Sequence, residues 1–150
     1  MSMKVAVLGG GAWGTALAMQ MERAGHAVRL WARNAELVET IRRGENPRYL
    51  PGVTIGGGLG ATIVASDALH GADCVLVVTP AQALRAVLGT IGQHVPKNVP
   101  VVLCAKGIEH DTGLLLSQIA VEFLPGNPVA ALSGPSFAAY LARSLPTAVD

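Results

Sequence analysis

Short runs of apolar residues alternate along this chain with stretches in which apolar residues recur every three or four positions. The runs predict strands at residues 5–8, 27–31, 62–65, 73–78, 99–104 and 129–132. The stretches predict helices whose buried stripes are Leu17, Met21 and Ala24; Leu37, Val38 and Ile41; Leu84, Val87, Leu88 and Ile91; and Leu115, Leu116, Ile119 and Phe123. Shorter helical segments are expected at 67–70 and 136–143, a loop rich in Pro and Gly at 45–60, and the start of another strand at 147–149.

Residues typical of helix ends flank these stripes. Gly25 and Gly44 are placed where a helix ends on a left-handed residue, and Asn34 is placed to cap the second helix. Asp111 or Thr112 is expected to cap the helix that follows it. Because strands alternate with helices, the chain is predicted to be α/β, a doubly wound, mostly parallel Rossmann sheet with helices on both faces. The expected strand order is 3-2-1-4-5-6, with a ligand at the carboxyl ends of the strands.

A glycine-rich turn follows the first predicted strand. Its spacing, Gly9-x-Gly11-x-x-Gly14, is the fingerprint of a strand, turn and helix that hold a pyrophosphate. Gly9 permits the tight turn, Gly11 lets the backbone approach a phosphate, and Gly14 lets the helix lie close to the sheet. The N–H groups at the start of the helix then face the anion. The preceding strand and the amphipathic helix favour dinucleotide binding over a merely structural turn.

The composition is typical of a single domain with a hydrophobic core, spanning residues 1–150. Of these residues 51% are hydrophobic and 14% charged, which suits a parallel sheet covered on both faces, or a piece of a larger enzyme that exposes an interface. A net charge of +1 gives no electrostatic reason to expect nucleic acid or an acidic membrane surface as a partner. No stretch predicts stable membrane insertion, and the glycines after Leu8 break the apolar helix that a secretory signal needs.

The cysteines and histidines carry no predicted chemistry. Cys74 and Cys104 lie in apolar, strand-like runs, which is typical of small buried thiols in a reduced, cytoplasmic protein. The histidines are scattered in turns without a partner at metal-ligand spacing, at positions His26, His70, His94 and His110. We therefore predict no metal site.

The end of the second strand bears on the choice of nucleotide. NAD-selective domains usually have Asp or Glu there to bond the ribose hydroxyls, whereas this chain has Leu30-Trp-Ala-Arg-Asn34. Arg33 is placed to pair with a 2′-phosphate or to stack on adenine, which predicts that NADP is at least tolerated beside NAD. An exposed arginine without a cofactor role is the other interpretation.

Three further positions fall at the carboxyl ends of predicted strands. Pro80 is placed to fix the turn beneath a nicotinamide ribose, although an ordinary strand-to-helix turn explains it equally well. Lys106 follows the fifth strand, where an ammonium group can hold a carbonyl oxygen or a substrate anion, or simply be solvated. Ser136 follows the sixth strand in Ser133-Gly-Pro-Ser-Phe137 and is placed either to contact an anion or to cap a helix.

Five motifs in register resemble those of the bacterial NAD(P)-dependent glycerol-3-phosphate dehydrogenases. They are Gly9-Gly-Gly-Ala-Trp-Gly-Thr-Ala-Leu-Ala18, Leu30-Trp-Ala-Arg33, Asn46-Pro-Arg-Tyr-Leu-Pro51, Cys104-Ala-Lys-Gly-Ile-Glu109 and Leu132-Ser-Gly-Pro-Ser-Phe-Ala138. The resemblance runs over all 150 residues. It implies an oxidoreductase that interconverts sn-glycerol 3-phosphate and dihydroxyacetone phosphate with NAD or NADP, for glycerophospholipid synthesis.

The same resemblance implies roles for individual residues. It carries cofactor contacts over to Ala12, Trp13, Arg33, Tyr49, Lys106 and Ala138, and substrate contacts to Lys106, Gly134 and Ser136. One departure is Tyr140, which stands where the family usually has Glu. This difference is expected to alter local packing or a contact with a second domain.

The family's general-base lysine and phosphate-binding arginine lie in a helical substrate domain. The resemblance therefore implies such a domain after residue 150, no catalytic residue within these 150, and a homodimeric full-length enzyme. Two alternatives stay open: another two-domain NAD(P)-dependent hydroxy-acid reductase, and a non-catalytic NAD(P)-binding sensor. The Asn46-Pro-Arg-Tyr-Leu-Pro51 and Ser133-Gly-Pro-Ser-Phe137 motifs speak against the reductase.

Overall fold

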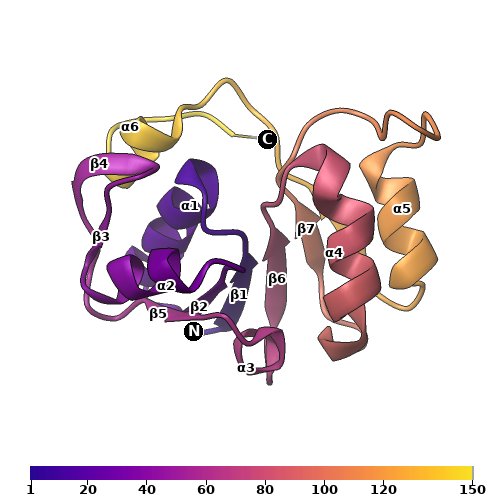
Figure 1. Cartoon of the computed structure of the whole chain (residues 1–150), viewed down its shortest axis with the longest axis horizontal. Coiled ribbons are helices and arrows are strands. Elements are labelled where there is room, and N and C mark those ends of the chain that lie inside the picture. Colours follow the sequence, from indigo (N-terminus) through magenta and orange to yellow (C-terminus); the bar gives the residue numbers. More distant parts are fainter. Residues whose placement is uncertain (150) are drawn as a thin grey trace.

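The computed structural model describes residues 1–149. Six strands form one sheet: β1 (Lys4–Leu8), β2 (Ala27–Trp31), β5 (Gly60–Thr62), β6 (Cys74–Val77), β7 (Val101–Leu103) and β8 (Val129–Ala131). Their order is β5-β2-β1-β6-β7-β8, and every neighbouring pair is parallel (Figure 1). This arrangement confirms the predicted doubly wound sheet and its strand order.

Helices cover both faces of this sheet. They are α1 (Ala12–Arg23), α2 (Ala35–Arg42), α3 (Ala65–Leu69), α4 (Leu84–Ile91), α5 (Leu116–Phe123) and α6 (Ala138–Ala142), with short 3-10 segments η1 (Ala81–Ala83) and η2 (Gly92–His94). Figure 1 shows α1, α2 and α6 on one side of the strands and α4 and α5 on the other. Among the described helices, none is both long and apolar enough to cross a membrane.

Strand β1 lies at the centre and supplies residues to two separate cores. Val5 and Val7 belong to the core that α1 and α2 complete, whereas Ala6 and Leu8 belong to the core that α4 and α5 complete. Successive side chains of a strand point to opposite faces, so an unbroken apolar run is what a strand covered on both faces requires. The continuous hydrophobic runs of β1 and β6 therefore become the two strands at the centre of the sheet.

The predicted ends of the first two helices are confirmed. The Asn34 side-chain oxygen accepts a hydrogen bond of 2.9 Å from the Leu37 N–H, so it satisfies one of the free N–H groups at the start of α2. Gly25 follows α1 with a φ of +92°, and Gly44 follows α2 with a φ of +95°. A glycine adopts this left-handed conformation without the steric cost of a Cβ, so both helices end there.

The predicted position of the third strand is wrong. The sequence predicts it at residues 62–65, but β5 spans Gly60–Thr62. Ile63 and Val64 are 50% and 45% exposed, and Val64 is the N-cap of α3 rather than part of the sheet. A pair of β-branched residues favours extended backbone, which a helix cap also has, and so the sequence pattern does not separate the two.

The loop expected at residues 45–60 contains a small antiparallel hairpin. Its strands are β3 (Glu45–Asn46) and β4 (Leu50–Thr54), and Leu50 and Val53 face the core beside α2. A strand of two residues has no periodicity to detect, and the prolines and glycines around it are typical of a loop. The hairpin is thus a feature that only the tertiary structure reveals.

Two further predictions near the C-terminus are wrong. Helix α5 starts at Leu116, with Leu115 as its N-cap, so neither Asp111 nor Thr112 caps it. The Thr112 hydroxyl instead donates to the Glu109 carboxylate at 2.6 Å. Residues 147–149 form no strand; the carbonyl of Ala148 accepts a hydrogen bond from the Ser136 hydroxyl.

Candidate functional site

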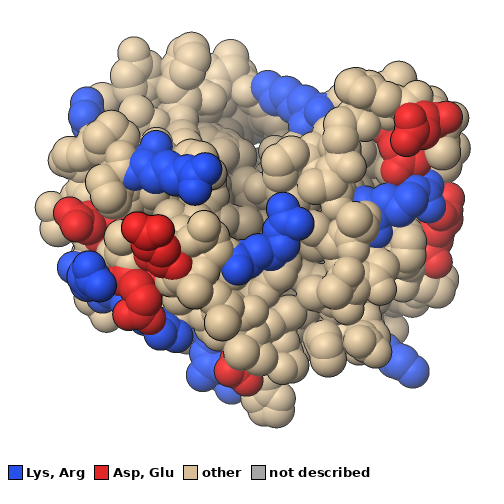
Figure 2. Space-filling model, in the orientation of Figure 1, with Lys and Arg blue, Asp and Glu red and all other residues tan. Residues whose placement is uncertain are grey.

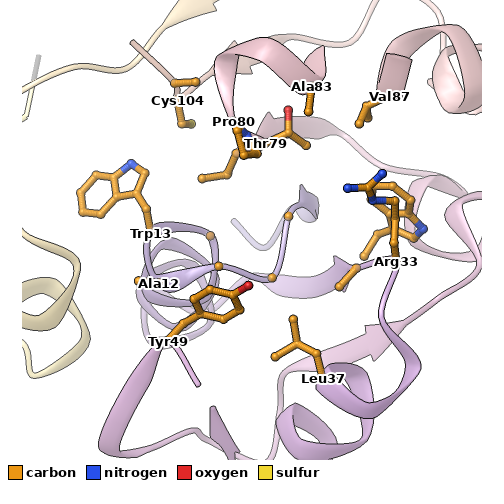
Figure 3. A pocket seen from close by; sticks show the side chains of 18 of the residues that line it. Ala12, Trp13, Arg33, Leu37, Tyr49, Thr79, Pro80, Ala83, Val87 and Cys104 are labelled. Carbon is orange, nitrogen blue, oxygen red and sulfur yellow. The ribbon is translucent and has the colours of Figure 1, made fainter. Parts of the chain in front are cut away.

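A cavity of about 490 Å³ opens at the carboxyl ends of β1, β2 and β6. This is the edge at which a doubly wound sheet is expected to bind its ligand. Most of the residues that were predicted to bind a cofactor line it, namely Gly9, Gly11, Ala12, Trp13, Gly14, Arg33, Tyr49 and Pro80 (Figure 3). Three segments thus converge on this cavity: the turn between β1 and α1, the connection between β2 and β5, and the turn after β6.

Two of the fingerprint glycines are required by the fold itself. A Cβ at Gly9 would lie 2.6 Å from the Val78 carbonyl oxygen, and Gly9 has a φ of +131°. A Cβ at Gly14 would lie 2.0 Å from the carbonyl oxygen of Gly9, closer than any side chain allows. Glycine at these positions lets the turn pass β6 and lets α1 start close to the sheet, as the sequence predicts.

The fold does not require a glycine at position 11. It is the N-cap of α1 with a φ of −71°, which any residue can adopt, and no atom lies within 4 Å of where its Cβ would be. The first N–H groups of α1 have no intrahelical acceptor, and its first turn contains no acidic residue. The space beside Gly11 therefore suits an anion, held by backbone N–H groups and the positive end of the helix dipole.

Arg33 stands at one end of the cavity, and Trp13 at the other (Figure 3). Arg33 is exposed, and within residues 1–149 it makes no ion pair. The residues before it, Leu30, Trp31 and Ala32, are buried and apolar, so the end of β2 itself has no carboxylate that could bond a ribose. Among the residues that line the cavity, Arg33 is the one with a charged side chain, so its guanidinium is placed to bind an anionic or aromatic group there.

Tyr49 reaches the cavity from the β3–β4 hairpin. In Figure 3 its ring lies beside the glycine turn, with the hydroxyl directed toward that turn. The Arg48 guanidinium lies 5.2 Å from the centre of the same ring, and the Tyr49 side chain is still 40% exposed. A hairpin that the sequence does not predict thus supplies one wall of the site.

Several lining residues were not predicted as ligands. They are Gly10, Trp31, Ala32, Asn34, Leu37, Val78, Thr79, Ala83, Val87, Cys104 and Ala105. Burial raises the pKa of the Cys104 thiol to about 12, so it stays a neutral, unreactive thiol at pH 7. Helical spacing marks Leu37 and Val87 as core residues, and only the fold shows that their outer ends border a cavity.

The other predicted ligand residues lie outside this cavity, at the ends of β7 and β8. The Lys106 ammonium donates a hydrogen bond of 2.9 Å to the Gly134 carbonyl, which brings two predicted substrate residues together. Ser136 donates to the Ala148 carbonyl, and Ala138 begins α6, where it packs against the core around α1. Two of the three predicted substrate residues, Lys106 and Gly134, therefore meet beyond the ends of β7 and β8, and Ala105, which precedes Lys106, lines the cavity.

The loop that carries Lys106 is fixed to α4. The Arg85 Nε donates to both oxygens of Glu109, at 2.9 Å and 3.1 Å, and Thr112 donates to the same carboxylate. The hydrogen bonds from Arg85, and then that from Thr112, hold the pKa of the Glu109 carboxyl below its usual value, so it is ionised at neutral pH. Gln82 also bonds a carbonyl and an N–H of this loop. Lys106 is thus presented by an ordered backbone.

Charged side chains and potential metal ligands are dispersed over the described residues. On the face shown in Figure 2, acidic and basic side chains are interspersed, without a broad basic patch of the kind that binds nucleic acid. Within residues 1–149, no three His, Cys, Asp or Glu side chains are grouped as a metal site would require. Three of the histidines are exposed and His26 is partly exposed.

Comparison with known proteins identifies relatives over the whole chain. A family model described as the NAD-dependent glycerol-3-phosphate dehydrogenase N-terminus matches residues 4–150. A protein named glycerol-3-phosphate dehydrogenase (NAD(P)+) from Mesorhizobium japonicum is 64% identical over 148 residues, which are 99% of this chain and 43% of that protein. A protein of the same name from Chelativorans sp. is 60% identical over 146 residues, 97% of this chain and 45% of that one.

The fold has a solved counterpart as well. The crystal structure of glycerol-3-phosphate dehydrogenase from Coxiella burnetii matches with a TM-score of 0.91 and 34% identity, over 99% of this chain and 46% of that one. The chain therefore spans less than half the length of the relatives that it matches.

Proposed function

Since this chain belongs to the NAD-dependent glycerol-3-phosphate dehydrogenase family, whose N-terminal domain it matches, we propose that it binds NAD(H) or NADP(H). We propose further that it supplies the cofactor half of an enzyme that interconverts sn-glycerol 3-phosphate and dihydroxyacetone phosphate for glycerophospholipid synthesis. The observation that carries the cofactor role is the open space beside Gly11, at the start of α1 and at the ligand edge of the sheet. Membership of this family also speaks against the hydroxy-acid reductase alternative.

The residues present fit a dinucleotide. The turn from Gly9 to Gly14 would hold the pyrophosphate, and Arg33 and Leu37 would border the adenosine. Trp13 and Pro80 would border the nicotinamide half. When bound, the nicotinamide ring supplies or accepts a hydride. The protein's part is to orient the ring and to keep water from one of its faces.

The group formed by Lys106 and Gly134 is the proposed place of the substrate. An ammonium at the end of β7 would hold the oxygen on the reacting carbon, and its present bond to the Gly134 carbonyl keeps the side chain extended toward β8. Ser136 and Ala138, on the turn that follows β8, would complete the contacts to substrate and cofactor. A lysine from a helical second domain would move the hydroxyl proton, as the resemblance implies.

Two broader features of the enzyme are also proposed. A cytoplasmic location is supported by two free cysteines in apolar surroundings, Cys74 and Cys104. A homodimer of the full-length protein, like the helical second domain, is supported by the family resemblance alone.

Calorimetric titration of the 150-residue chain with NADH and with NADPH tests the proposed cofactor role. We expect saturable binding of one nucleotide per chain, because the strand, turn and helix of the fingerprint are all in place. A heat signal that fails to saturate at millimolar concentrations of either nucleotide would contradict the proposal.

Replacing Arg33 with Asp is expected to separate the two nucleotides. If the guanidinium meets a 2′-phosphate, Arg33→Asp should weaken NADPH binding by about ten- to a hundredfold more than NADH binding, since a charge-assisted hydrogen bond is worth roughly 1.5–3 kcal/mol. The measurement is the ratio of the two dissociation constants for wild type and variant.

Lys97→Asp is the matched control for Arg33→Asp. Lys97 is exposed on the loop before β7, at the opposite edge of the sheet, so the net charge changes equally without touching the cavity. We expect this control to leave the ratio unchanged. Equal weakening of NADH and NADPH by Arg33→Asp would indicate stacking on adenine in place of a phosphate contact.

A further inference from the structure

A buried polar cluster lies directly beneath the glycine turn. The side-chain amide of Asn46 donates hydrogen bonds to the Gly10 carbonyl at 3.1 Å and to the Thr15 hydroxyl at 2.9 Å. The Thr15 hydroxyl in turn donates to the same Gly10 carbonyl at 3.3 Å. Both side chains are fully buried, with 0% exposed surface. Two donors from different elements therefore converge on one carbonyl of the turn.

The Asn46 side chain comes from β3, the strand of the hairpin that also carries Tyr49. Its oxygen accepts a hydrogen bond of 3.3 Å from the Tyr49 N–H, so each of its polar atoms has a partner. A fully satisfied polar network inside an apolar core fixes one arrangement of its members, because each broken bond leaves a buried polar group unpaired. The hairpin and the glycine turn are thereby held in one geometry.

The orientation of the peptide between Gly10 and Gly11 follows from this cluster. A trans peptide is planar, so its carbonyl and its N–H point in opposite directions. Because the Gly10 carbonyl points inward to Asn46 and Thr15, the Gly11 N–H points outward. Within residues 1–149 this N–H has no hydrogen-bond acceptor, and the side of Gly11 that a Cβ would occupy is open.

We propose that Asn46 is a positioning residue of the cofactor site: it holds the Gly10–Gly11 peptide so that the Gly11 N–H faces the pyrophosphate. The β3–β4 hairpin is then part of the phosphate-binding apparatus, in addition to carrying Tyr49 to the rim of the cavity. This inference rests on the proposed binding of a dinucleotide.

The experiment compares two ligands that differ in the pyrophosphate. ADP-ribose contains it, whereas adenosine 2′-monophosphate lacks it. We expect Asn46→Leu to weaken ADP-ribose binding by roughly tenfold or more, the loss of one charge-assisted hydrogen bond, and to leave adenosine 2′-monophosphate binding within about twofold. Binding is measured by calorimetry for the tighter ligand and by NMR titration for the weaker one. A residue that only stabilised the fold would affect both ligands alike.

Val53→Ala is the matched control for Asn46→Leu. Val53 packs the same hairpin against the core but makes no contact with the glycine turn through a side-chain hydrogen bond. We expect this variant to lower the thermal midpoint and to leave both affinities within about twofold of wild type. Equal losses for both ligands in Asn46→Leu, or a selective loss in Val53→Ala, would overturn the assignment.

Two further variants keep the test decisive. If Asn46→Leu does not fold, Thr15→Val removes the second donor to the Gly10 carbonyl, and a selective loss of about threefold for ADP-ribose is expected. Asn46→Leu in a Tyr49→Ala background should keep its selective loss. Disappearance of the loss in that background would assign the effect to Tyr49 and overturn the peptide mechanism.

The failure of this inference differs from the failure of the proposed function. If the wild-type chain binds neither ADP-ribose nor NADH, both the proposed function and the role of Asn46 are contradicted. A wild-type chain that binds both ligands, with Asn46→Leu and Thr15→Val binding them equally well, would overturn the role of Asn46 alone.

Discussion

Replacing Gly11 with valine is expected to remove detectable dinucleotide binding and to leave the fold intact. The φ of −71° and ψ of −172° at Gly11 are extended backbone that a β-branched residue adopts readily, and no atom lies within 4 Å of the added Cβ. The new side chain would fill the space beside the start of α1, where the pyrophosphate must lie. Exclusion of the phosphate from two or more N–H groups, at about 1.5–3 kcal/mol each, corresponds to a loss of at least a hundredfold.

The control for Gly11→Val is the same substitution at a second open glycine. Gly126 lies in the turn between α5 and β8, at the far edge of the sheet, and a Cβ there also meets nothing within 4 Å. Calorimetry with NADH and NADPH, beside thermal unfolding of the variants and wild type, gives both readouts. Equal affinity of Gly11→Val and wild type would contradict the assignment of the fingerprint, whereas a large drop in its thermal midpoint would show that Gly11 matters for folding.

The 150-residue chain by itself is expected to reduce dihydroxyacetone phosphate at least about 10²–10⁴ times more slowly than a full-length relative. Reduction of a ketone needs a proton donor within hydrogen-bond reach, as well as cations for the phosphate. At the ligand edge of the described structure, Arg33 lies at the proposed adenosine end, the Arg48 guanidinium lies 5.2 Å from the ring centre of Tyr49, and Lys106 is bonded to the Gly134 carbonyl. One lysine cannot both hold the reacting oxygen and bind a phosphate at the far end of the substrate.

The measurement is NADH and NADPH oxidation by this chain and by the Mesorhizobium japonicum relative, which is 64% identical over 148 residues. Calorimetry on both proteins provides the control, since similar cofactor affinities would exclude an empty cofactor site as the cause of slow turnover. Turnover by the 150-residue chain at the rate of the relative would mean that a proton donor lies within these residues. Lys106→Met would then be the variant that identifies it.

Much of the fold could be predicted because it depends on local patterns. The limits of β2 are those predicted from its apolar run, the Asn34 cap is present, and Gly25 and Gly44 end their helices with positive φ. Each of these features is decided within a few residues of the chain. Two predictions are wrong because the same residue type suits another local role. Val64 was expected in a strand but is the N-cap of α3, and Thr112 was a candidate helix cap but bonds to Glu109.

Sequence patterns were sufficient to predict the doubly wound sheet, the glycine fingerprint and, through five motifs in register, the resemblance to the family that the comparisons confirm. Contacts between residues far apart in the chain became visible only in the folded molecule. Asn46, Thr15 and Gly10 are up to 36 positions apart, and neither spacing nor composition connects a buried asparagine to a carbonyl of the turn. It also showed that the glycines differ in role. A side chain at Gly9 would collide with the Val78 carbonyl after β6, and one at Gly14 with the Gly9 carbonyl, whereas the space beside Gly11 is open. Local sequence patterns depend on residues that are close together in the chain. Contacts between distant segments depend on how side chains fill the space between them, which is determined only when the chain packs.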